Sequence, residues 1–111
     1  MDAELKKTEE MIRAQEQYLS DIRAKAKEDQ AAANAVGLST DASGRISNYD
    51  EAFGAAIDKY NAAVEKKNKG LISDEAFEKA EEEYENFIKV LEQYEETLNL
   101  LEQEQEKLID L

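Results

Sequence analysis

The sequence contains no cysteine, histidine, proline or tryptophan, and the first two absences exclude several kinds of functional site. Structural zinc sites need Cys or His ligands, and the usual di-iron helical bundle needs Glu-x-x-His motifs. A nucleophilic triad needs a base beside its nucleophile, and no histidine is present to serve as one. We therefore expect no enzymatic activity, no metal centre of these kinds and no cofactor.

Hydrophobic runs and basic residues are also scarce. No apolar run approaches the roughly 20 residues that cross a bilayer. The chain has 14 Lys and Arg against 27 Asp and Glu, a net charge of −13, and fourteen of the acidic residues lie within residues 74–111. Nucleic acids and anionic membrane surfaces both attract clustered basic side chains. We therefore expect neither a nucleic-acid partner nor membrane binding, and we expect a cytoplasmic location.

Helix-favouring residues dominate what is present, because Glu, Lys, Gln, Ala and Leu fill long stretches that only four glycines interrupt. The expected fold class is all-α, with an elongated three-helix coiled-coil or helical-hairpin arrangement in a single domain over residues 1–111. A short loop or small β-hairpin should join the first two helices. The glycines and the apolar periodicity predict helices at about 2–36, 49–67 and 74–110, a loop at 37–48 and a turn at 68–73.

Apolar side chains recur every three or four residues in the second and third predicted helices, which is typical of helices that pack on a neighbour. The six-residue turn predicts that the second helix runs antiparallel to the first half of the third. The first helix has a weaker seam, because Thr8, Gln15 and Asp29 interrupt it. The main core should consist of Phe53, Ile57, Tyr60, Val64, Phe77, Tyr84, Phe87 and Leu91, and the third helix continues the seam with Tyr94, Leu98, Leu101 and Leu108.

The unequal helix lengths lead to a further expectation. An up, down, up path would make the first helix parallel to the third, and the second helix is too short to cover both. Leu5 and Ile12 should then be exposed at one end, and Leu98, Leu101, Leu108 and Ile109 at the other. Exposed seams usually find a partner helix, so we expect self-association through them. The acidic third helix favours an antiparallel arrangement of the two copies, or an association that weakens at low salt, where charges are poorly screened.

Two similar segments, GRISNYDEAF (44–53) and GLISDEAF (70–77), precede the second and third predicted helices. The first overlaps a twelve-residue stretch that resembles an EF-hand loop, with Asp41, Ser43 and Asp50 at ligand positions but little charge. We interpret both segments as structural, because Gly permits a turn and the following Asn or Ser can cap a helix. In the first, Asn48 and Glu51 suit a capping box. A calcium-responsive module at residues 39–50 is a less favoured alternative.

The segment GRISNYDEAFGAAIDKYNAAVE, followed by FIKVLEQYEETLNLLEQEQEKLIDL, resembles the coiled-coil region of tail tape measure proteins from long-tailed bacteriophages. The likeness covers about residues 36–111 and is most specific at Ile46–Glu51 and Gln93–Thr97. It implies that the chain is a piece of a longer protein that sets tail length and scaffolds tube assembly. The implied partners are other tail assembly proteins, and the implied location is the host cytoplasm and then the virion tail. A prefoldin-like chaperone and a coiled-coil interaction module are the alternatives.

Overall fold

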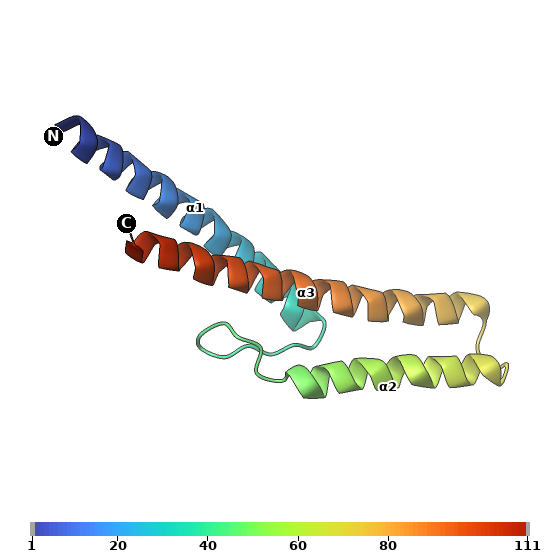
Figure 1. Cartoon of the computed structure of the whole chain (residues 1–111). Helices are drawn as coiled ribbons and strands as arrows, with labels where there is room; N and C mark the ends of the chain where they lie inside the picture. The colour runs from blue at the N-terminus through green and yellow to red at the C-terminus, as the bar shows by residue number, and fades with distance from the viewer. Residues whose placement is uncertain (1, 111) are drawn as a thin grey trace.

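The computed structural model describes residues 2–110, and within them the chain forms three α-helices and no β-strand. The helices are α1 (Asp2–Ala35), α2 (Tyr49–Asn68) and α3 (Asp74–Asp110). The prediction of an elongated all-α fold is confirmed, because the molecule measures 76 × 25 × 16 Å (Figure 1). Its Cα radius of gyration is 20.6 Å, whereas a compact domain of this length has about 13 Å.

Helix α3 is the spine of the molecule, and the other two helices lie one after the other along it (Figure 1). Helix α2 runs antiparallel to the first half of α3, as predicted, since ion pairs join Lys59 to Glu83 and Lys67 to Asp74. Helix α1 packs on the second half of α3. Within residues 2–110, no Cα atom of α1 lies within 8 Å of a Cα atom of α2.

The predicted up, down, up path is wrong, because α1 runs antiparallel to α3. Gln15, in the first half of α1, contacts Glu104 near the end of α3. Asp29, near the end of α1, contacts Thr97, which comes earlier in α3. The physical reason lies in the loop at 36–48, which doubles back on itself so that α2 leaves in the same direction as α1 (Figure 1). The two chain ends therefore lie at one end of the rod, and Leu5 and Leu108 do not mark opposite ends.

The main core lies at the middle of the rod, where α1 ends, the loop folds back and α2 begins. Its buried side chains are Ala33, Leu38, Phe87, Leu91 and Tyr94. This position differs from the prediction, which centred the core on the α2/α3 hairpin. Helix α2 contains no buried residue, because two helices alone cover each other from one side only. Of the predicted core, Phe87 and Leu91 are buried, and the half-buried members are Phe53, Ile57, Tyr60, Val64, Phe77 and Tyr84.

Helix α3 changes its contact face along its length. Its first half presents the predicted stripe to α2. In its second half, Tyr94, Thr97 and Glu104 are the buried residues, whereas the predicted Leu98, Leu101 and Leu108 are half-buried. The predicted single seam fails here, because α3 has two partners that approach it from different sides.

Candidate functional site

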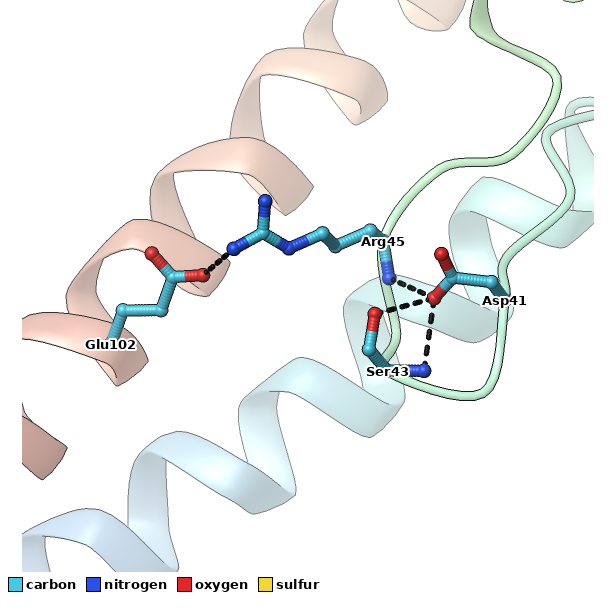
Figure 2. A network of polar contacts seen from close by, with 4 residues as sticks. All are labelled: Asp41, Ser43, Arg45 and Glu102. Atoms are coloured by element: carbon cyan, nitrogen blue, oxygen red, sulfur yellow. Dashed lines mark hydrogen bonds and ion pairs between the residues drawn. The ribbon is translucent and has the colours of Figure 1, made fainter.

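The loop between α1 and α2 is the most elaborate polar structure of the chain. One oxygen of the Asp41 carboxylate accepts hydrogen bonds from the Ser43 amide (2.9 Å), the Ser43 hydroxyl (2.6 Å) and the Arg45 amide (3.0 Å), as Figure 2 shows. These bonds, that of the Ser43 hydroxyl first, lower the pKa of Asp41. A single antiparallel bridge joins Thr40 to Ile46, so the loop is a rudimentary hairpin.

The residues that resemble calcium ligands are placed in structural motifs. Asp41 and Ser43 hold the turn described above, and Asp50 lies exposed in the first turn of α2, where the helix dipole favours an acid. Across residues 2–110, no three Asp or Glu side chains converge in a way that could hold a metal ion. The arrangement of Asp41 is explained by the turn alone.

Three side chains fix this loop to the helices, and a fourth closes its base. The buried Tyr94 hydroxyl donates to the carbonyl of Gly44, and burial, followed by the negative charges of Asp41 and Asp29, raises the pKa of Tyr94. The side chain of Gln30 on α1 donates to Thr40 (2.7 Å), and Arg45 forms an ion pair with Glu102 of α3 (2.6 Å; Figure 2). The fourth is Asn48, whose contacts differ from the prediction.

The predicted capping box at Asn48 is wrong. The Asn48 side chain makes no hydrogen bond to the amides of α2. Its oxygen accepts from the Ser39 amide (2.7 Å) and its nitrogen donates to the Gly37 carbonyl (3.0 Å), so it closes the base of the loop. The predicted cap of α3 is present, because the Ser73 hydroxyl accepts from the Ala76 amide (3.1 Å).

Gly37 ends α1 as the sequence predicts. Its φ of +96° lies in the left-handed region, which glycine adopts without strain. The Leu38 amide donates to the carbonyl of Ala33 (3.0 Å) and the Gly37 amide donates to that of Asn34 (3.2 Å), the two hydrogen bonds of a Schellman motif. Leu38 and Ala33 are both buried in the core, so this helix end also positions the loop.

Two buried polar layers join α1 to α3, and sequence reasoning missed both. The Asp29 carboxylate accepts from Thr97 (2.6 Å) and Gln93 (3.2 Å). Further along, Gln15 donates to Glu104 (2.7 Å). Gln15 and Asp29 were interpreted as defects of the α1 seam, whereas each has a polar partner on α3. The sequence does show polar residues at seam positions of α1. Their partners on α3 can be identified only when the antiparallel register of the two helices is known.

A groove of about 420 Å³ lies between α2 and α3, and the end of α1 closes it at Ala35–Gly37. Its floor includes Tyr60 and Tyr84, whose rings stack with centroids 5.1 Å apart. The ion pair of Lys59 with Glu83 (3.0 Å) lies at the groove, and the hydrogen bond and charge of Lys59 lower the pKa of Glu83. Three members of the predicted hairpin core, Tyr60, Tyr84 and Phe87, therefore line an accessible groove.

Comparison of the chain with protein-family models, with curated proteins and with solved structures gave no match. Among the described residues, no helix is long and apolar enough to cross a membrane. The functional interpretation rests on the geometry above and on the sequence resemblance.

Proposed function

We propose that the chain is a structural arm of a phage tail tape measure protein and that it scaffolds tail assembly through its helix surfaces, without catalysis. The observation that carries this proposal is the rod itself: an uninterrupted 37-residue helix supports two shorter helices in tandem over 76 Å. The sequence resemblance at Ile46–Glu51 and Gln93–Thr97 supplies the family.

The polar interactions support a structural role. The hydrogen bonds of Asp41, Asp29 and Glu104 connect a loop or a helix to its neighbour. Their carboxylates are thus occupied in holding the rod together. A scaffold needs this kind of rigidity along its length, because it works by presenting surfaces at fixed separations.

The positions of the two termini favour an arm over a length-setting segment. Both lie at one end of the rod (Figure 1), so a parent chain would enter and leave at the same place. A folded arm of this kind adds little to the axial length of the parent. The same residues drawn out as one helix would add roughly 165 Å at 1.5 Å per residue.

An in-frame deletion of residues 2–110 from the parent gene tests the proposal. We expect fewer assembled tails, with the length of those that form almost unchanged in electron micrographs. A matched control removes as many residues from another helical part of the parent and should shorten the tail by about 1.5 Å per residue. The same shortening in the test deletion would show that this segment measures length and would contradict the arm.

Two further tests distinguish a tape measure parent from the chaperone alternative. Tail-tube genes should flank the coding sequence, and their absence would count against a tape measure parent. Suppression of the aggregation of an unfolded client protein by the purified chain would instead favour the prefoldin-like chaperone.

A further inference from the structure

The α2/α3 hairpin lacks a third helix along most of its length. Helix α1 occupies the side of α3 only as far as Ala35, and the groove begins where α1 ends. The groove therefore continues the surface of α3 on which α1 packs. Half-buried Tyr60 and Tyr84 line it and remain accessible, and half-buried Phe77 lies against Tyr60, although their spacing is that of core residues. A further helical surface would bury these side chains.

The size of the hairpin face suits a second copy of the same face. The 20 residues of α2 extend about 30 Å, and two adjacent helices are about 20 Å wide. A face-to-face pair would bury about 600 Å² on each copy, or about 1,200 Å² in total, which is the lower limit for specific protein interfaces. Such a pair would close a four-helix bundle around the two grooves.

The charges of α2 select the orientation of that second copy. Asp50 and Glu51 lie in its first turn, and Lys66 and Lys67 lie in its last turn. An antiparallel arrangement places the acidic start of one α2 against the basic end of the other. A parallel arrangement would oppose like charges and would also bring together the acidic second halves of α3, which is unfavourable.

From these features we propose that two copies of the chain associate through their α2/α3 grooves, in an antiparallel, two-fold symmetric four-helix bundle. The two rods then overlap only along their hairpins and extend in opposite directions. From a 76 Å rod and an overlap of about 30 Å, the dimer is about 120 Å long. This contact is independent of the assignment to a tape measure protein, because it follows from the hairpin alone.

The variant Ala55→Glu tests the groove contact. Ala55 lines the groove and is exposed in the single chain, so a carboxylate there leaves the monomer fold intact but enters the interface. We expect sedimentation equilibrium to show a dimer of the unaltered chain and at least a tenfold weaker dimer for the variant. The matched control is Ala24→Glu, the same change at an exposed position of α1, which should leave dimerisation unchanged.

A charge exchange tests the orientation. Glu51, Ala55 and Lys66 lie on one side of α2, since they are separated by four and eleven residues, close to whole helical turns. Glu51→Lys and Lys66→Glu should each weaken the dimer several-fold. The double variant should restore affinity, because the opposite charges face each other again. Circular dichroism should show equal helicity in all three variants.

Spin labels supply a direct distance. The chain has no cysteine, so a single Cys can be labelled at Asn61, an exposed residue of α2 outside the groove lining, or at the exposed Glu9 of α1. We expect a separation below about 40 Å, four helix diameters, between the two labels at position 61. The two labels at position 9 should lie beyond the measurable range, since they sit at opposite ends of the dimer.

Three outcomes would overturn the proposal. The first is a monomer at every concentration up to about 1 mM. Even a weak dimer with a Kd of about 1 mM, or about 4 kcal/mol of association free energy, would be detected there, so this result would mean that the groove binds a different partner. The second is a dimer that survives Ala55→Glu but is lost with Leu5→Glu, which would place the contact at the tip of α1. The third is a short distance between the labels at position 9.

Discussion

Tyr94 and Asn48 show how single residues decide the path of this chain. Tyr94 reaches the loop from the middle of α3 and contacts Gly44, and Asn48, at the end of the loop, contacts Gly37 across its base. Gly44, with a φ of +86°, could not gain a side chain without strain, and an added Cβ would lie 3.5 Å from the Tyr94 oxygen. The loop conformation, and with it the direction of α2, therefore depends on a few polar contacts.

Replacement of Tyr94 by Phe should destabilise the protein by about 1 kcal/mol, because the Gly44 carbonyl loses its donor while the ring still fills its site. For a domain of this size that corresponds to a decrease in Tm of about 4–8 °C. Thermal unfolding followed by circular dichroism measures it. Tyr18→Phe is the control, since Tyr18 is 46% exposed; an equal decrease in both variants would refute a role for the hydroxyl.

Glu104 should make the stability depend on pH. Hydrogen bonds from Gln15 and then Lys107 lower its pKa below the ordinary 4.5, so the folded state favours the carboxylate. The stabilisation is complete above the pKa of the unfolded chain and is lost as pH falls through the lowered pKa of the folded state. Glu104→Gln should thus lower Tm at pH 7, and the difference from the unaltered chain should diminish as the pH falls below 4.5 and through the lowered pKa of the folded state.

The control for this titration is Glu106→Gln on the same helix, at an exposed position. Its Tm should differ little from that of the unaltered chain at either pH. A Glu104→Gln variant whose deficit is the same at pH 7 and pH 3 would show that the carboxylate charge is unimportant.

At the scale of helices, the sequence predicted the elements well and their arrangement only in part. Apolar spacing and the positions of Gly37 and Gly70 define where helices begin and end, and these are local properties. The direction of α1 depends on the contacts of the loop, and its register depends on pairs such as Asp29 with Thr97, which are 68 residues apart. The periodicity of α3 alone also cannot show that α3 packs on two different helices, each with its own set of contact residues.

The location of the core can be tested with two truncations. Leu91→Ala removes a side chain that is 3% exposed in the core and should cost about 2–5 kcal/mol. Ile57→Ala removes a half-buried side chain of α2 and should cost clearly less, because little of its surface leaves water on folding of the monomer. Urea unfolding at a concentration where the chain is monomeric provides both values. A larger destabilisation by Ile57→Ala than by Leu91→Ala would show that the main core lies in the α2/α3 hairpin, as predicted from the sequence.

At the scale of the whole molecule, the tandem arrangement on α3 explains why a small chain forms a long object. Each partner covers only part of the spine, so the cross-section never exceeds a few helices, and much of the apolar surface of α2 remains accessible. The length of the predicted third helix, at about 1.5 Å per residue, correctly anticipated an elongated form. It could not anticipate the return of the chain to its starting end, because that is decided by a loop and not by a repeat.

Small-angle X-ray scattering of the dilute chain should give a radius of gyration near the 20.6 Å of the Cα trace, slightly larger with hydration. A value near 13 Å, as for a compact domain of this length, would contradict the tandem arrangement. A value that rises with concentration towards that of a rod of about 120 Å would report the dimer. Measurements with Ala55→Glu separate the two contributions, since this variant should keep the monomer value throughout.

The antiparallel contact of α1 with α3 also determines how the chain responds to a pull on its two ends. Both ends lie at one end of the rod (Figure 1), so tension separates the two helices one layer at a time instead of shearing all layers together. The Gln15 to Glu104 layer opens before the Asp29 to Thr97 layer, and the central core carries the load last. Layers that break singly yield at low force, because each is opposed by only its own local free energy. A pull on the two ends should therefore open the folded chain stepwise and at low force, in the one direction of load in which the rod lacks the rigidity that its helices otherwise give it.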